Sequence, residues 1–81
     1  IQRKAGDIAG AIEAYQSGLQ LDPESPELHQ NLGAALLAGG NFEAARESFL
    51  MAIGLLVQQN RQGEAEALAR SAGELVNLNA A

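Results

Sequence analysis

Residues 26–56 have the sequence PELHQNLGAALLAGGNFEAARESFLMAIGLL, and this stretch decides the fold. Its apolar residues recur at intervals of three and four, the spacing of one face of an α-helix. Gly39-Gly40 interrupts the pattern, and helices commonly end at a glycine. The stretch therefore predicts two amphipathic helices folded back on each other, Pro26–Ala38 and Asn41 to about Leu56.

A shift of this stretch by 34 residues toward the N-terminus lands on a second copy of the same pattern. The matched pairs are Gly40 with Gly6, Asn41 with Asp7, Phe42 with Ile8, Ala45 with Ala11, Glu47 with Glu13, Phe49 with Tyr15 and Ile53 with Leu19. A fixed period of this length is typical of a solenoid of helical repeats, in which each repeat covers its neighbours.

The composition favours helices over strands. Apolar residues make up 47% of the 81 residues, and most of them are alanine and leucine, which are good helix formers. β-branched residues, which favour sheets, are few. The length suits one small domain or a fragment of a larger one, and the first residue is Ile1 rather than methionine, so we expect the true N-terminus to be missing.

The charge balance argues against a nucleic-acid partner. The net charge is −5, and six acids but no bases lie between Ala5 and Ala45. Binding to nucleic acid or to an acidic membrane surface requires a basic stripe, which is absent. No apolar run of about 18 residues appears, so no membrane span is predicted.

The absence of cysteine rules out a disulfide framework, a thiolate zinc site and a cysteine nucleophile. It leaves the compartment open, with the cytoplasm favoured. The histidine His29 has no further metal ligands at suitable spacing. Gly39-Gly40 is a helix-ending pair rather than a phosphate loop. We therefore expect no catalytic residues, no metal and no cofactor.

Taken in order, the chain begins with Ile1–Ala5, which resembles the last turn of a helix ended by Gly6. Asp7 is expected to cap a helix from about Ile8 to Leu21, and Asp22-Pro23 stops that helix.

Ser25 and Pro26 start the next helix as N-cap and first residue, and Asn41 caps the one after it. Gln58–Gly63 is polar and predicts a turn. The last helix is expected from about Glu64 to Leu78, with an apolar stripe made of Ala65, Leu68, Ala69, Ala72, Leu75 and Val76.

At this point the pattern resembles the tetratricopeptide repeat. The first helix of the complete copy carries His29, Leu32, Gly33 and Leu36, and its second helix carries Ala45, Phe49 and Ala52. The preceding copy supplies Ala11, Tyr15, Gly18 and the closing Pro23. The small residues let the helix axes approach, and the large ones fill the gaps beside the crossing.

The chain departs from the family pattern at three places. His29 replaces a bulky residue, commonly tryptophan, and Val57 replaces a second closing proline, so we expect the helix to continue to about Gln59. Leu68-Ala69 follows Leu32-Gly33 by 36 residues rather than 34. The resemblance implies an all-α, right-handed solenoid of helix hairpins, with about four full helices and an N-terminal helix remnant. We divide it into repeats over residues 1–59 and a capping helix and tail over residues 60–81.

The resemblance implies that first helices line a concave groove for a peptide or a partner helix. The groove residues carried over are Glu27, Gln30, Asn31, Ala34, Leu37 and Ala38, with Arg3 and Lys4 before them and Glu66, Arg70 and Glu74 after them. Asn31 stands where many members bond a peptide backbone, although asparagine is also common before Leu-Gly. The basic set that holds a chaperone's C-terminal carboxylate is incomplete, so that ligand is not predicted.

Three functions remain open. The first is a non-catalytic scaffold or adaptor that binds proteins or peptides. The second is an accessory arm of a larger enzyme, such as a glycosyltransferase, sulfotransferase or methyltransferase, with its catalytic domain elsewhere. The third is self-association through the truncated N-terminal edge, where Ile8 and Ile12 lack a preceding helix.

Overall fold

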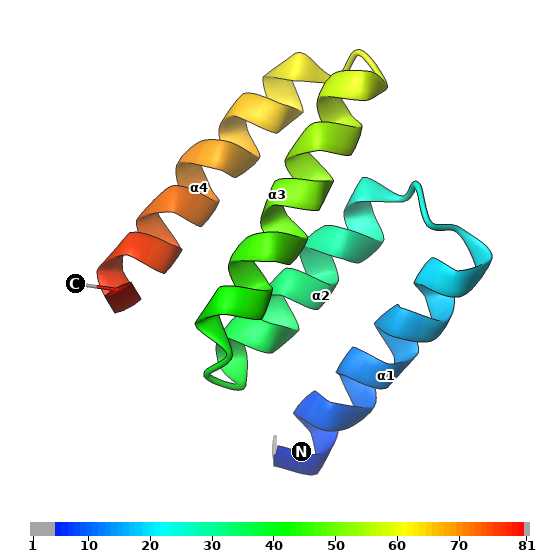
Figure 1. Ribbon diagram of the computed structural model, residues 1–81, viewed down its shortest axis with the longest axis vertical. Helices are drawn as coiled ribbons and strands as arrows, with labels where there is room; N and C mark the ends of the chain where they lie inside the picture. The colour runs from blue at the N-terminus through cyan, green and yellow to red at the C-terminus, as the bar shows by residue number, and fades with distance from the viewer. Residues whose placement is uncertain (1–4, 81) are drawn as a thin grey trace.

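Four antiparallel helices make up the protein, whose computed structural model describes residues 5–80. They are α1 (Ala5–Leu21), α2 (Pro26–Ala38), α3 (Phe42–Gln58) and α4 (Gln62–Ala80), and no strand occurs in this range. The chain runs up and down through them in sequence order (Figure 1). Helices packed as successive hairpins confirm the all-α class predicted from the 34-residue period.

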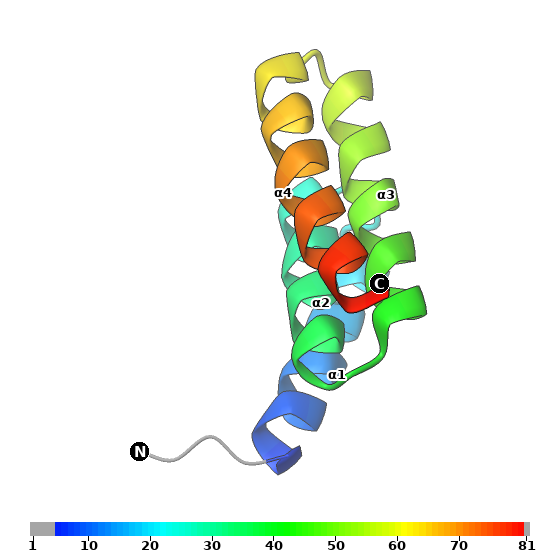
Figure 2. The ribbon, with the colours of Figure 1, turned by 90° about the vertical axis from the view of Figure 1, so that its left-hand side faces the viewer.

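The helices form two layers rather than a closed bundle. Each helix packs against its neighbours in the chain, most extensively α2 against α3. Seen from the side, α2 and α4 both lie to one side of α3 (Figure 2). The molecule measures 37 × 35 × 22 Å, and its thickness matches about two helix diameters. The two first helices of the repeats, α2 and α4, therefore share one layer.

The core lies where α3 is enclosed between α2 and α4. Ala45 and Ala52 are fully covered, and Phe49 is 4% exposed. From α4, Ala65, Leu68 and Ala72 complete this core, and Leu36, Leu37 and Ile53 pack against it with part of their side chains. Leu32 is also buried. A Cβ at Gly33 would lie 2.9 Å from Phe49 Cε1, which explains why only hydrogen fits there.

Local signals set both ends of α2. Ser25 Oγ accepts a hydrogen bond from the Leu28 amide at 3.2 Å, and Pro26 occupies the first turn, where its missing N–H leaves no gap in the helix. At the other end, Gly40 has φ +86°. The amides of Gly40 and Asn41 donate back to the carbonyls of Leu37 and Leu36, which is a Schellman motif.

The turn between α3 and α4 repeats this motif without glycine. Asn60 has φ +62°, and its amide donates to the Val57 carbonyl while the Arg61 amide donates to the Leu56 carbonyl. Without a closing proline, α3 continues to Gln58, one residue short of the predicted Gln59.

The same turn explains the spacing of the Leu-Gly-like pairs. At the 34-residue period, the end of α1 at Leu21 corresponds to Leu55, so α3, which has 17 residues like α1, ends three residues later in its repeat than α1 does. The connection that follows is one residue shorter. The two differences together shift Leu68-Ala69 by two residues from the expected position.

Two helix starts were predicted wrongly. The helix expected from Ile8 begins at Ala5, so Gly6 and Asp7 lie inside α1 rather than marking its boundary. The propensity loss at one glycine, about 1 kcal/mol, does not end a helix without further signals. The helix expected over Glu64–Leu78 spans Gln62–Ala80, because the Schellman turn closes at Arg61. The helix remnant was predicted over Ile1–Ala5; Ala5 is instead the first residue of α1, and residues 1–4 lie outside the described range.

None of the helices in the described range has a stretch long and apolar enough to cross a lipid bilayer.

Candidate functional site

A shallow groove lies between α2 and α4, on the layer of first helices. Leu56 of α3 forms its floor. One wall comes from α2, the other from α4, and the wall residues are Glu27, Gln30, Glu64, Ala67, Leu68 and Ser71. A groove with an apolar floor and polar walls can hold an extended peptide or one face of a helix, because the floor accepts side chains and the walls offer hydrogen bonds.

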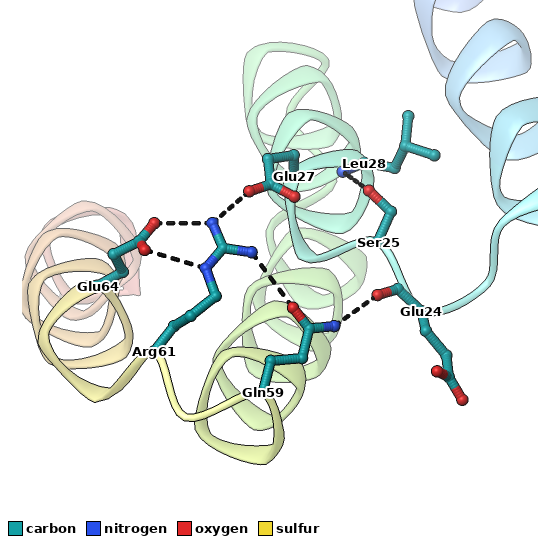
Figure 3. Close-up of polar contacts among 7 residues, drawn as sticks. All are labelled: Glu24, Ser25, Glu27, Leu28, Gln59, Arg61 and Glu64. Carbon is teal, nitrogen blue, oxygen red and sulfur yellow. Dashed lines mark hydrogen bonds and ion pairs between the residues drawn. The ribbon is translucent and has the colours of Figure 1, made fainter.

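Arg61 connects the two walls at one end of this groove (Figure 3). Its guanidinium donates to Glu64 through Nε at 3.0 Å and through a terminal nitrogen at 2.8 Å. The same terminal nitrogen donates to Glu27 on α2. Arg61 thus joins the N-terminal ends of α2 and α4 through two carboxylates.

Gln59 extends this network to the preceding turn. Its Oε1 accepts from the other terminal nitrogen of Arg61 at 3.2 Å, and its Nε2 donates to the Glu24 carbonyl at 2.9 Å. Both interhelix turns at this end of the molecule are thereby linked (Figure 3).

The network shifts the pKa of each ionisable member. Hydrogen bonding to Arg61 lowers the pKa of Glu27 and the pKa of Glu64 below the ordinary value of 4.5. The hydrogen bonds that Arg61 donates to these carboxylates, to Glu64 first, raise the pKa of Arg61. All three groups carry charge at neutral pH, so this end of the groove presents a paired rather than a free set of charges.

The groove residues inferred from the resemblance fall into three groups. Glu27 and Gln30 line the groove. Asn31, Ala34 and Ala38 are exposed on α2 beyond its lining, while Leu37 is half-buried against the core. From the last helix, Glu66 faces the α3–α4 side, and Arg70 and Glu74 are exposed without lining the groove. Arg3 and Lys4 lie outside the described residues.

The residues that the sequence assigned to packing lie on helices, except Pro23, which lies in the turn between α1 and α2. Leu32, Gly33, Ala45, Phe49 and Ala52 are buried. Ala11, Tyr15 and Leu36 are half-buried, and Pro23 is exposed.

His29 occupies the position where the family commonly has a bulky residue, and its side chain makes a hydrogen bond to the preceding loop. It is half-buried, and its Nε2 donates to the Pro23 carbonyl at 3.2 Å. This bond joins the first turn of α2 to the preceding loop. Over the range for which side chains are described, no cluster of three or more histidine, cysteine or carboxylate residues is arranged to hold a metal ion.

A second hollow, which shares no residue with the groove, lies between α3 and α4. Its lining is mostly apolar and consists of Arg46, Phe49, Leu50, Ile53, Ala69, Ala72 and Gly73. Leu50 is 60% exposed there. We refer to these seven residues as the α3–α4 hollow.

Sequence reasoning missed Arg61 and the α3–α4 hollow. A signal for Arg61 was present, because it precedes Glu64 by three residues and follows Glu27 by 34, one repeat period. The hollow had no comparable signal, because α4 was treated as a capping helix.

These features define a helical-repeat protein with a groove along its first helices. Residues 1–40 match the family model described as TPR repeat. A TPR repeat-containing protein of Synechococcus elongatus is 51% identical over 41 residues, which cover 51% of this chain. Both matches support the assignment of the chain to the tetratricopeptide repeat family.

The matched segment covers 10% of the length of that curated relative. The comparison with solved structures gives no match. Repeats of this family generally mediate protein–protein interactions and are typically non-catalytic.

Proposed function

We propose that the chain is a non-catalytic interaction module that binds a peptide or a partner helix in the groove between α2 and α4. The supporting observation is the groove itself, with Leu56 on its floor and residues of two first helices on its walls. It lies on the layer where the family resemblance places ligand contacts.

The wall chemistry favours a ligand that supplies hydrogen bonds and one or two apolar side chains. Gln30 and Ser71 are exposed and face the groove from opposite walls, so both can bond a peptide backbone. Ala67 and Leu68 offer apolar surface between them. Glu27 and Glu64 are already bonded to Arg61, which makes them a fixed end of the groove rather than free anchors.

The proposal is tested by selecting peptides from a random displayed library on the immobilised chain and measuring the Kd of the selected sequences by titration calorimetry. Gln30→Ala removes a wall hydrogen bond, and Ala67→Arg fills the groove. We expect Ala67→Arg to weaken binding at least about tenfold, equivalent to about 1.4 kcal/mol.

Two matched variants act as controls. Gln58→Ala and Ala9→Arg make the same chemical changes at exposed positions outside the groove. If these controls weaken binding as much as the groove variants do, or if Ala67→Arg binds with unchanged Kd, the groove is not the binding site.

A further inference from the structure

The two walls of the α2–α4 groove do not pack against each other. In the described part of the chain, α2 and α4 each pack on α3, and no Cα atom of one lies within 8 Å of a Cα atom of the other. Leu56 of α3 lies between them as the floor of the groove. The width of the groove therefore depends on how each wall sits on α3 and on any side chain that crosses the gap.

Arg61 is a side chain that crosses this gap (Figure 3). It lies in the turn before α4, and one of its terminal nitrogens donates to Glu27 of α2, which is 34 residues earlier in the chain. Among the described residues, no other ion pair or side-chain hydrogen bond joins α2 to α4 or to the turn before α4. Arg61 itself does not line the groove.

The backbone of Arg61 is held from both sides. Its amide donates to the Leu56 carbonyl at 2.8 Å, and its carbonyl accepts a hydrogen bond from the Ala65 amide at 3.0 Å. The first of these bonds connects Arg61 to the residue that forms the groove floor. The guanidinium therefore extends from a fixed point of the backbone at the start of α4.

The two carboxylates hold the guanidinium in different ways. Glu64 follows Arg61 by three residues and accepts from Nε at 3.0 Å and from a terminal nitrogen at 2.8 Å. A contact at two nitrogens fixes the plane of the guanidinium. Glu27 accepts from the same terminal nitrogen but belongs to the opposite wall. Glu64 therefore orients Arg61, and Glu27 connects it to α2.

We propose that Arg61 is a positioning residue, which holds α2 and α4 at the separation that a groove ligand requires without contacting the ligand. This inference rests on the proposed function. A site that is arranged before binding costs the ligand less than one that must be ordered during binding. If the bridge is lost and about a third of the molecules keep the required separation, the apparent Kd rises about threefold.

Spin-label distances across the groove test the proposal without a ligand. The chain has no cysteine, so Asn31→Cys on α2 and Glu66→Cys on α4 provide the two label sites, both exposed and outside the groove lining. We expect Arg61→Gln to lengthen and broaden the distances measured by pulsed electron paramagnetic resonance, because Glu27 and Glu64 then repel each other. Arg70→Gln, at an exposed position outside the groove, is the matched control and should leave them unchanged.

An uncharged ligand separates positioning from direct contact. The probe is a library-selected peptide that has no ionisable side chain and has blocked ends, so salt does not act on charges of the ligand. Titration calorimetry gives its Kd at low and high sodium chloride, with screening lengths of about 30 Å and about 3 Å. We expect the Kd of the unaltered chain to rise with salt, because exposed ion pairs weaken. Arg61→Gln should have a Kd about threefold higher at low salt and a smaller response to salt.

A double-mutant cycle tests whether Glu27 is the partner through which Arg61 acts. Glu27→Gln keeps the shape of the side chain and removes its charge. Alone, it should widen the label distances and weaken peptide binding as Arg61→Gln does. In the Arg61→Gln background it should cause no further loss, because the bridge is already absent. Arg61→Lys keeps the charge but loses the two-nitrogen contact with Glu64, so its affinity should lie between those of the unaltered chain and Arg61→Gln.

Three outcomes overturn the proposal, provided that circular dichroism shows the helices to be retained. The first is an unchanged label distance in Arg61→Gln. The second is an uncharged peptide that binds the unaltered chain and Arg61→Gln with the same Kd. The third is a cycle in which the losses from Glu27→Gln and Arg61→Gln add, which indicates separate contacts with the ligand. If no peptide is selected, the proposed function fails, while the label distances still decide whether Arg61 sets the separation.

Discussion

At the scale of single residues, the contact between Gly33 and Phe49 sets how closely α2 and α3 approach. A methyl group at Gly33 would lie 2.9 Å from Phe49 Cε1 and 3.1 Å from Cζ. The ring is buried and fixed by its neighbours, so it has little room to yield. The sequence showed that this position is small, and the structure shows which side chain requires it.

Gly33→Ala and Gly54→Ala should have opposite effects on stability. In a helix, alanine is favoured over glycine by about 1 kcal/mol, and Gly54 has no atom within 4 Å of an added Cβ. At Gly33 the overpacking penalty of about 1–3 kcal/mol outweighs this gain. Urea unfolding should therefore show a higher free energy of unfolding for Gly54→Ala and a lower one for Gly33→Ala. Equal gains at both positions would contradict the packing described for Phe49.

Phe49→Ala should lower the free energy of unfolding by about 3–5 kcal/mol. The ring is 4% exposed and contacts both hairpins of the core, so its loss leaves a cavity that helices cannot easily close. Thermal unfolding followed by circular dichroism measures the effect. Phe42→Ala is a suitable control, because Phe42 is 37% exposed and should lose much less stability. An unchanged melting midpoint for Phe49→Ala would be incompatible with this core.

Arg61→Gln should raise the pKa of Glu27 and the pKa of Glu64 toward 4.5, since Arg61 is the main cause of both lowered values. Carboxylates with lowered pKa stabilise the folded state above their unfolded pKa. That contribution is lost as the pH falls through the lowered folded-state pKa. The stability difference between the unaltered chain and Arg61→Gln should therefore be largest near neutral pH and vanish in acid.

Carbon-detected NMR titration of the glutamate carboxyl groups measures these pKa values directly. If the pKa values of Glu27 and Glu64 are the same in Arg61→Gln as in the unaltered chain, Arg61 does not bind these two carboxylates in solution.

The ion pairs of Arg61 also show what could not be predicted from the sequence at the level of single residues. Its spacing to Glu64 and Glu27 was visible, but the ion pairs depend on where the α3–α4 turn places the guanidinium. That placement follows from a three-residue connection whose length was not predicted.

At the scale of elements, both hairpin turns use the same backbone geometry with different residues. Gly40 has φ +86° and Asn60 has φ +62°, each at the left-handed position of a Schellman motif. Glycine takes this conformation without strain, and asparagine takes it more readily than other residues with a side chain.

Asn60→Ala should therefore destabilise the chain by about 1 kcal/mol, because alanine in this conformation loses about 1–2 kcal/mol and asparagine loses less. Asn60→Gly, which keeps the turn, should be at least as stable as the unaltered chain. Urea unfolding of the two variants checks the order. A stable Asn60→Ala variant would mean that the turn does not depend on a left-handed residue at this position.

Helices with capping signals at both ends could be predicted accurately from the sequence. The bounds of α2 were predicted correctly because Ser25, Pro26 and Gly40 fix its ends. The start of α1 was predicted wrongly because Gly6 alone was taken as a stop signal. The start of α4 was placed two residues late because Asn60 gave a weaker turn signal than a glycine would.

At the scale of the whole molecule, the 34-residue period determined which helices share a layer, and this could be predicted without coordinates. The lining of the groove could be predicted only on the α2 side, where Glu27 and Gln30 face it. On the α4 side the groove is lined by Glu64, Ala67 and Ser71, whereas the predicted Glu66, Arg70 and Glu74 lie outside its lining. Positions carried over from α2 mark one side of α4, but the wall that faces α2 is formed by the other side of that helix.

The layered arrangement gives the chain two separate surfaces, the α2–α4 groove and the α3–α4 hollow. The groove lies on the layer formed by α2 and α4, and the hollow lies between α3 and α4.

The central claim is that ligand binds in the α2–α4 groove, and NMR chemical-shift mapping tests it most directly. The isotope-labelled chain is titrated with a library-selected peptide while the backbone amides are followed. The account predicts that the largest shifts occur at Gln30, Ala67 and Ser71, with small shifts at Leu50 and Gly73. The largest shifts at Leu50 and Gly73, with the groove amides unmoved, would contradict it.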